Sequence, residues 1–330
     1  MIIAEIAQAH DGSLGNVHAY LDALGSSGVD AVKFQTHIAE AESSIHEPFR
    51  VKFSKQDKTR YEYWKRMEFT TEQWHGIKSH CDDLGIEFMS SPFSNAAVNL
   101  LEELNVLRYK IGSGEINNWL MLEKIAKTGK PIILSSGMSC YQELDQTFDF
   151  LKSYDNQLSI LQCTTQYPTN PEVWGLNVIG ELKERYRVPV GYSDHSGDIY
   201  ACLAAASLGA DIFEFHVVFD KRQFGPDTRA SITIDEVAKL TEGIRQIQTA
   251  IAHPVNKNIN DQFTLLKGIF EKSLAVNKDL SAGHTVSFED LEAKKPKNMG
   301  IDAKDFKDII GKKLRTSLSK WDFLEPRHFV

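Results

Sequence analysis

The stretch VPVGYSDHSGDIYACLAAASLGADIFEFHVV, residues 188–218, decides the fold. It begins and ends with short apolar runs, Val188–Ser193 and Ile212–Val218, which we predict as strands. The alanine-rich segment between them, Tyr200–Leu208, has the spacing of apolar residues that is typical of a helix. We therefore predict a strand–helix–strand unit for this segment. The same pattern recurs in the sequence before it.

The same alternation runs from the first residues to about residue 250. Six further strands are predicted at Ile2–Ile6, Ala31–Thr36, Glu87–Ser91, Arg108–Ser113, Pro131–Ser136 and Ser159–Thr164. Helices are predicted at Val17–Ser26, Thr71–Leu84, Ala96–Leu104, Trp119–Lys127, Tyr141–Ser153, Val178–Tyr186 and Ile234–Ala252. Eight strand–helix repeats predict an α/β fold, the (β/α)8 TIM barrel. An open doubly wound sheet is the alternative, but the first strand is not followed by a GxGxxG turn.

The character of the chain changes after Ala252. The sequence HPVNKNINDQ, residues 253–262, is polar and contains proline and asparagine, as linkers do. We predict a barrel catalytic domain at residues 1–252, a linker at 253–269 and a small domain at 270–330. Short strand-like pieces at Ser273–Val276 and Thr285–Ser287 indicate an α+β or β-clip fold for the small domain, whose core is marginal at this size.

Composition excludes several classes of protein. The chain of 330 residues has a net charge of −8, which argues against nucleic acid as a partner. No apolar run approaches the roughly 20 residues of a membrane helix, and the start MIIAEIAQAH has no basic segment typical of a signal peptide. The cysteines lie far apart without a CxxC pair, as reduced thiols do: Cys81, Cys140, Cys163 and Cys202. We expect a cytoplasmic enzyme.

One connection is too long for an ordinary barrel loop. Residues 37–69, HIAEAESSIHEPFRVKFSKQDKTRYEYWKRMEF, follow the second predicted strand. Long ordered loops in compact domains are usually functional, so we expect a lid or a subunit contact. The basic and aromatic residues of this loop also suit nucleic acid, but Glu47, Asp57 and Glu62 interrupt the basic run.

Polar side chains gather at the carboxyl ends of the predicted strands, where the chemistry of a barrel collects. Parallel strands buried on both faces are normally apolar, so this density indicates a site. The candidate residues are Glu5, Lys33, Gln35, Ser91, Phe93, Lys110, Ser113, Glu115, Ser135, Thr165, Tyr167, Ser193, His195, His216 and Asp227.

The two strand lysines, Lys33 and Lys110, each need an anion if they are buried. An internal ion pair with Glu5 or Glu115 is one explanation for either lysine alone. For both together, ringed by serine and threonine hydroxyls, an anionic ligand fits better. Two lysines suit a ligand that carries two anionic groups. We therefore predict a small ligand such as a phosphorylated carboxylic acid.

Two histidines end neighbouring predicted strands, so the imidazoles of His195 and His216 can converge. A lone core histidine is more often structural, but a pair with open positions suits a divalent transition metal. The acids beside them, Asp194 and Glu214, are candidates for orienting these ligands.

Several motifs together resemble one known family. In order they are AEIAQAHDGS (4–13), VKFQT (32–36), SSPFS (90–94), YKIGSGE (109–115), ILSSGM (133–138), QYPT (166–169), GYSDHS (191–196) and GPD (225–227). This set is similar to the sialic acid synthases and related nonulosonate synthases. KSLAVNKDLSAGHTVSFEDLEAKKP (272–296) and IIGKKL (309–314) resemble the antifreeze-like (SAF) domain of those enzymes. The resemblance spans nearly the whole chain.

The resemblance implies a transferase that condenses phosphoenolpyruvate with an open-chain N-acyl hexosamine, giving a nine-carbon 2-keto-3-deoxy acid and phosphate. It implies Mn²⁺, with Mg²⁺ or Co²⁺ as alternatives, on His195 and His216. It also implies a homodimer in which each SAF domain closes the partner's barrel. Phosphoenolpyruvate would meet Lys33, Lys110, Ser91, Ser113, Ser135, Thr165 and Ser193. The sugar would meet Glu5, Gln35, Phe93, Glu115, Tyr167, Asp227 and Lys295.

Some positions depart from the family pattern. Ala9 replaces an asparagine, Thr165 stands where asparagine is expected, and Lys295 replaces the arginine that reaches the N-acetyl group. Because lysine cannot supply the planar fork of arginine, the identity of the sugar stays open.

Three other functions stay open at this point. One is a synthase of the same chemistry acting on another sugar, non-N-acetylated or phosphorylated. The second is a Schiff-base aldolase that uses Lys110 or Lys33. The third is a sugar-binding protein without catalysis.

Overall fold

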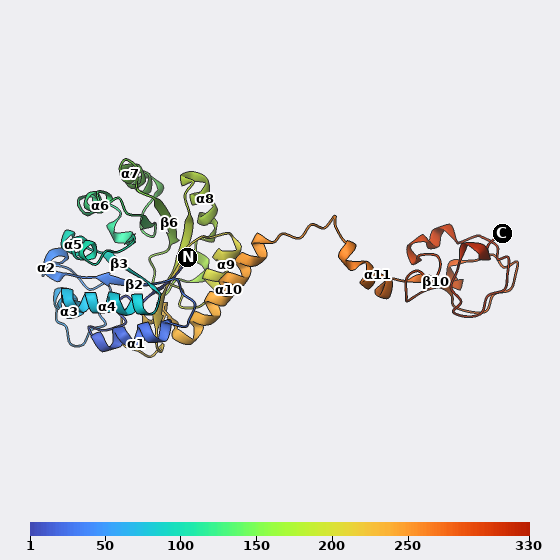
Figure 1. Cartoon of the computed structure of the whole chain (residues 1–330), viewed down its shortest axis with the longest axis horizontal. Coiled ribbons are helices and arrows are strands. Elements are labelled where there is room, and N and C mark those ends of the chain that lie inside the picture. Colours follow the sequence, from blue (N-terminus) through green and yellow to red (C-terminus); the bar gives the residue numbers. More distant parts are fainter. The chain divides into compact units, whose positions relative to one another are not determined.

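Eight parallel strands form a barrel in the computed structural model, which describes residues 1–330 (Figure 1). They pair in the order β3-β2-β1-β8-β7-β6-β5-β4, and β3 contacts β4 to close the ring. This confirms the predicted (β/α)8 barrel. The strands are β1 (Ile2–Glu5), β2 (Ala31–Thr36), β3 (Glu87–Pro92), β4 (Tyr109–Ile111), β5 (Ile132–Ser135), β6 (Leu158–Cys163), β7 (Val190–Asp194) and β8 (Phe213–Val218).

Helices follow the strands and surround the sheet in the first unit (Figure 1). Several begin with a side chain that caps the first turn, such as Ser13, Thr70, Ser94 and Asn118. The helices are α1 (Leu14–Leu24), α4 (Thr71–Asp83), α5 (Asn95–Glu103), α6 (Trp119–Ala126), α7 (Tyr141–Lys152), α8 (Leu176–Tyr186), α9 (Tyr200–Ser207) and α10 (Ile234–Ala252). The main core lies between these helices and the strands.

A second, smaller core fills the interior of the barrel. Successive side chains of a strand point to opposite faces, so Ala4 packs on the helices while Ile3 faces inward. The inward layer consists of Ile3, Ala31, Met89, Ile133, Leu161 and Ile212. These side chains form an apolar floor under the next inward layer.

The long connection after β2 contains two helices that the sequence analysis did not predict. They are α2 (Ala39–Glu42) and α3 (Arg60–Met67), and α3 begins with a capping box made by Thr59 and Glu62. Their side chains Ala39, Tyr63, Trp64 and Met67 form a separate buried cluster. The segment is therefore packed on a core of its own. A short strand, β9 (Ile232–Thr233), which pairs with β8, was also not predicted.

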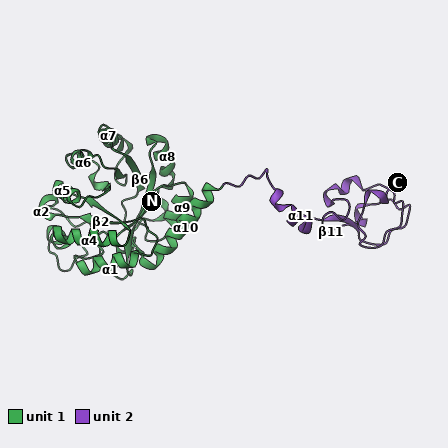
Figure 2. Ribbon diagram, viewed as in Figure 1, with its two compact units in different colours: residues 1–253 green, residues 254–330 purple.

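The chain divides into two compact units, residues 1–253 and 254–330 (Figure 2). In the second unit, β10 (Ser273–Val276) pairs antiparallel with β11 (Leu291–Lys294). The predicted strand Thr285–Ser287 is absent, since Thr285 makes only an isolated bridge to Lys313. Within the predicted linker, the apolar run TLLKGIF forms α11 (Thr264–Phe270). The core of this unit comprises Leu274, Val276, Leu280, Val286, Ile309, Leu314, Leu318, Leu324 and Phe329.

None of the helices combines the length and the apolar character needed to cross a bilayer.

Candidate active site

A cavity of about 500 Å³ opens at the carboxyl ends of the barrel strands. That volume is in the range of small-molecule sites. Every candidate residue that the sequence analysis placed on the barrel lines it: Glu5, Lys33, Gln35, Ser91, Phe93, Lys110, Ser113, Glu115, Ser135, Thr165, Tyr167, Ser193, His195, His216 and Asp227. Lys295 belongs to the second unit, where its ammonium lies 5.0 Å from the centre of the Phe270 ring.

Strand geometry explains why polar groups meet here. Each apolar residue of the barrel floor is followed, two positions later in the chain, by the next side chain that points inward. That side chain is polar or a thiol in every case. These side chains are Glu5, Lys33, Ser91, Ser135, Cys163 and Glu214, and all are buried. The period of the strands therefore stacks a polar layer directly on an apolar one.

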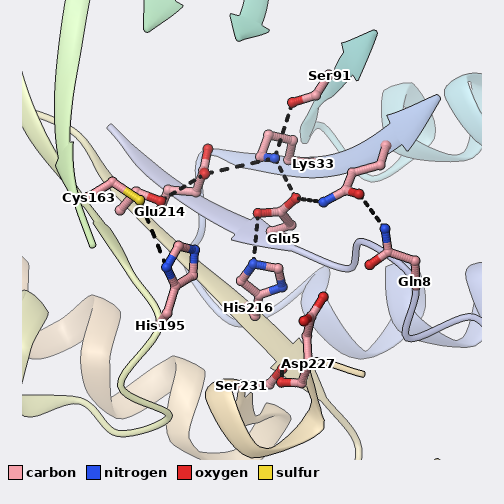
Figure 3. Close-up of polar contacts among 12 residues, drawn as sticks. Glu5, Gln8, Lys33, Ser91, Cys163, His195, Glu214, His216, Asp227 and Ser231 are labelled. Carbon is pink, nitrogen blue, oxygen red and sulfur yellow. Dashed lines mark hydrogen bonds and ion pairs between the residues drawn. The ribbon is translucent and has the colours of Figure 1, made fainter. Parts of the chain in front are cut away.

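Four buried charges form one network, and Figure 3 shows three of them, Glu5, Lys33 and Glu214. The ammonium of Lys33 lies 2.5 Å from Glu5 Oε1 and 3.8 Å from Glu214 Oε1. The ammonium of Lys110 lies 3.0 Å from the same Glu214 oxygen, to which Ser193 also donates at 3.2 Å. Internal ion pairs therefore exist for both lysines. The partner of Lys110 is Glu214, and not Glu115 as one prediction had it.

The network sets the protonation of its members. Burial alone would raise the pKa of Glu5, but the charge of Lys33, then of His216 and Lys110, outweighs it and holds this pKa well below its usual range. Burial would likewise lower the pKa of Lys33, but the carboxylates of Glu214 and Glu5 raise it above its ordinary value. Glu5 is thus ionised and Lys33 is protonated at neutral pH.

Two buried oxygens in the cavity lining have no hydrogen-bond partner, Ser135 Oγ and Glu214 Oε2. Buried polar atoms are normally satisfied, so these two indicate room for a polar ligand. Gly137 adds to this cradle, because a Cβ there would lie 2.4 Å from Thr165 Oγ1 and 2.6 Å from Ser113 Oγ. The absence of a side chain at Gly137 lets the hydroxyls approach its backbone.

The two histidines of the metal prediction lie close together, with ring centres 5.3 Å apart. The Nδ1–H of His195 donates to the carbonyl of Thr164 at 2.9 Å, which leaves its Nε2 free as a ligand. His216 Nε2 lies 3.3 Å from Glu5 Oε2 (Figure 3). No group of three or more His, Cys, Asp or Glu side chains is arranged to hold a metal. The residues fit a divalent ion that takes two imidazoles and fills its other positions with ligand and water.

The two acids named as possible orienters of these histidines have other contacts. Asp194 accepts hydrogen bonds from the backbone and side chain of Ser196. Glu214 contacts the lysines, as described above. That part of the sequence prediction is wrong for two different reasons. Asp194 and His195 are consecutive, so their side chains point to opposite faces. Glu214 lies on the same face as His216, but its carboxylate is paired with the two lysines. Glu5, from β1, is the carboxylate beside His216.

The outer part of the cavity carries the predicted sugar contacts. Burial raises the pKa of Glu115, which accepts a hydrogen bond from Asn118 at 2.7 Å. The Tyr167 ring lies over His195, with centres 4.1 Å apart. Arg50 covers the Tyr167 ring at 4.1 Å and forms an ion pair with Asp227. The long connection after β2 therefore reaches the loop after β8.

The cavity also contains residues that the sequence analysis did not assign to the site. From the long connection come His37, Glu42, Glu47, Arg50, Phe53, Arg60, Tyr63 and Trp64. From the barrel come Gln8, Met138 and Cys163, together with Glu214 in its role as the partner of both lysines. The position of His37 directly after the VKFQT strand was the one signal that could have placed it here.

A (β/α)8 barrel with buried lysines, an unsatisfied hydroxyl and two close imidazoles lining a cavity at its strand ends has the features of an enzyme active site. Comparison with protein-family models shows to which enzyme family the chain is similar. The model described as the NeuB family matches residues 20–256, and the SAF domain model matches residues 271–327. The SAF match agrees with the predicted class of the second unit.

Curated relatives match over nearly their whole length. The N,N'-diacetyllegionaminic acid synthase of Campylobacter jejuni is 34% identical over 318 residues, which covers 94% of this chain and 95% of that protein. The N-acetylneuraminate-9-phosphate synthase of Mus musculus is 32% identical over 325 residues, covering 97% and 90%. A solved N-acetylneuraminic acid (sialic acid) synthetase from Leptospira borgpetersenii, in complex with citrate, has a TM-score of 0.71 at 29% identity, covering 80% of this chain and 89% of that one.

The chain belongs to the NeuB family and is an enzyme of its synthase class. The predicted resemblance to this family is thereby confirmed.

Proposed function

We propose that this chain is a nonulosonic acid synthase that condenses phosphoenolpyruvate with an open-chain N-acyl hexosamine. The products are a nine-carbon 2-keto-3-deoxy acid and inorganic phosphate. The observation that carries the proposal is the cradle at the strand ends. Two buried lysines, the unsatisfied hydroxyl of Ser135 and the bare backbone of Gly137 lie in the same cavity there. A small ligand with a phosphate and a carboxylate satisfies that set.

The residues divide between the two substrates. Lys33 and Lys110 donate hydrogen bonds to the anionic groups of phosphoenolpyruvate, and hydroxyls orient it: Ser91, Ser113, Ser135, Thr165 and Ser193. The acceptor sugar lies farther out. Its hydroxyls meet Gln35, Glu115, Tyr167 and Asp227, and Phe93 supplies an apolar surface beneath it.

A divalent ion on His195 and His216, with Mn²⁺ as our first choice and Mg²⁺ or Co²⁺ as alternatives, supplies Lewis acidity to the aldehyde oxygen when it is bound. Lys33 and Lys110 hold phosphoenolpyruvate so that its C3 faces the aldehyde carbon. Formation of the C3–C1 bond leaves positive charge at C2. The ionised carboxylate of Glu5 lies beside both Lys33 and His216, so it stabilises that charge and then accepts a proton from the water that adds at C2.

Phosphate then leaves the tetrahedral intermediate by cleavage of its C2–O bond. The electron pair of that bond goes to the phosphate oxygen, and the C2 hydroxyl becomes the ketone as its proton passes to the departing phosphate. The proton that Glu5 took from water passes to the former aldehyde oxygen, which becomes a hydroxyl. The two ammonium groups stabilise the departing anion without transferring a proton to it.

A Schiff-base aldolase fits the site less well. Such an enzyme needs a neutral amine as nucleophile. The pKa of Lys33 is raised by its two carboxylates against the effect of burial, and Lys110 is engaged by Glu214 at 3.0 Å. No observation favours this second function, and borohydride trapping with a carbonyl substrate tests it directly.

The acceptor sugar, the assembly and the location are further parts of the proposal. Lys295 takes the place at which the family resemblance implies an arginine, so the acyl group is bound by a single ammonium. We propose a domain-swapped homodimer in which the second unit of one chain brings Lys295 to the partner's barrel, and we place the enzyme in the cytoplasm. Neither nucleic acid nor a membrane is a proposed partner.

The test is release of phosphate from phosphoenolpyruvate against a panel of free and phosphorylated hexosamines, with and without Mn²⁺. We expect release with at least one sugar, loss of it on chelation, and recovery with Mn²⁺ or Co²⁺. The Lys110→Met variant should lose turnover, and Lys127→Met, a surface control whose lysine pairs only with Glu123, should not. If no phosphate is released with any sugar of the panel, the proposal is wrong.

A further inference from the structure

His37 is held in an unusual place at the edge of the cavity. It follows β2 directly, and its imidazole is stacked between two aromatic rings. The Trp64 ring from α3 lies 3.9 Å away at 18°, and the Phe93 ring from the loop after β3 lies 4.7 Å away at 11°. Because rings cover both faces, the imidazole can bind other groups only through its edge.

The edge of this imidazole is engaged on both sides. Nδ1 lies 2.6 Å from Glu42 Oε1, a carboxylate of α2 that is itself buried. Glu42 is fixed in turn, since its other oxygen accepts from the backbone of Ile38 at 3.2 Å. Nε2 of His37 lies 3.1 Å from Gln35 Oε1 and 3.2 Å from the amide nitrogen of Gln8. His37 therefore connects α2 of the long connection to Gln35.

Gln35 carries the connection to the charged network. Its Nε2 donates to Glu5 Oε1 at 2.8 Å, and its Oε1 accepts from the Gln8 amide. A glutamine amide has two orientations related by a half-turn, and only one of them presents N–H to a carboxylate. The Gln8 amide selects that orientation, because one of its N–H groups donates to Gln35 Oε1. His37 holds the Gln8 amide in turn, since the Nδ1–H donates to Glu42 and the bare Nε2 accepts from Gln8.

We infer that Glu42 and His37 form a positioning pair, which orients the Gln35 amide so that it holds the Glu5 carboxylate in place. The inference rests on the proposed function, since it assigns a supporting role in that reaction. Neither residue belongs to the set assigned to substrates or metal above. Their effect passes through Gln35 to Glu5, whose other oxygen faces His216.

The His37→Phe variant separates this role from packing. Phenylalanine keeps a flat ring between Trp64 and Phe93 but removes both nitrogens. We expect kcat to fall about 10- to 100-fold, as when a reacting group is misplaced by a fraction of an ångström to one ångström. The KM for phosphoenolpyruvate should stay close to that of the native chain. The melting temperature should fall, because the buried Glu42 carboxylate keeps only its bond to the Ile38 amide, so the selective loss of kcat at unchanged KM is the readout. His75→Phe, the same substitution at a histidine that is half exposed, is the control.

Substitutions of Glu42 give a second readout. Glu42→Gln keeps an oxygen that accepts from the imidazole, so it should recover most of the kcat that Glu42→Ala loses. A purely structural role predicts that both Glu42 variants lose thermal stability and kcat together, which would overturn the inference. Full activity of His37→Phe would overturn it as well. If the native chain itself shows no turnover, the proposed function fails, and that outcome is distinct from either of these.

Discussion

The Glu214→Gln variant tests whether the buried network is balanced as described. Glu214 Oε1 is the shared partner of Lys110 and Lys33, while Oε2 has no partner. Glutamine keeps the shape and one accepting oxygen, so Ser193 and Lys110 retain a hydrogen bond. What the variant removes is one negative charge, which leaves two ammonium groups against the single carboxylate of Glu5.

The distances give the size of the effect. For unit charges 3.0 Å apart, as Lys110 and Glu214 are, Coulomb's law gives about 5 kcal/mol at an effective dielectric constant of about 20. Breaking a buried pair costs about 3–5 kcal/mol, and the retained hydrogen bond places this variant at the lower end. We therefore expect a loss of about 3 kcal/mol, which for a unit of 253 residues lowers the melting temperature by about 6–12 °C.

Thermal melting with and without phosphoenolpyruvate is the assay. The native chain gains about 2.7 kcal/mol at a ligand concentration one hundred times Kd. In the variant the ligand's anion replaces the missing charge and no longer faces the Glu214 carboxylate, so the ligand should raise the melting temperature by more than in the native chain. If the variant and the native chain are equally stable in the absence of ligand, the proposed balance of buried charges is refuted. A ligand shift smaller than the native one also refutes it.

Two more predictions use other residues. Burial lowers the pKa of His10 to about 3, so the unfolded chain binds the extra proton and stability falls as pH drops below about 6.5. In the His10→Asn variant the side chain can still accept a hydrogen bond from the Gly12 N–H but no longer titrates. Between pH 8 and pH 5 this variant should therefore lose about 2 kcal/mol less unfolding free energy than the native chain, as measured by urea unfolding. The same pH dependence in both proteins would contradict the prediction. Gly137→Ala should cut kcat/KM about 100-fold by displacing Thr165, whereas Gly180→Ala, with open space around it, should not.

The barrel could be predicted because two features of the sequence agree. Apolar runs marked the strands, and the order of the repeats marked parallel pairing. The helix α3 was missed because it is short and buries only Tyr63, Trp64 and Met67 against its own small cluster. The strand β11 was missed because Leu291–Lys294 has no fully buried residue, and its pairing with β10 depends on a distant segment.

The candidate site was predictable to the extent that it follows the period of the strands. Residues at strand ends share one rim, so their gathering could be predicted from position alone. The partner of Lys110 could not, because β4 and β8 are far apart in the order of the sheet and their side chains meet only across the barrel interior. The role of His37 was hidden for a similar reason, since Trp64 reaches it from a helix that the sequence did not reveal.

The charges of the cradle argue for a cation independently of the family resemblance. Lys33 and Lys110 are balanced by Glu5 and Glu214, so the network is close to neutral before any ligand arrives. Phosphoenolpyruvate brings about three negative charges, since a phosphate alone carries about −1.5 to −2 near neutral pH and the carboxylate adds one. Burying that excess without compensation is costly. The imidazoles of His195 and His216, the second of them beside Glu5, offer a place for a divalent ion that offsets most of this negative charge. The proposed metal and the proposed anionic substrate therefore each make the other's binding more favourable.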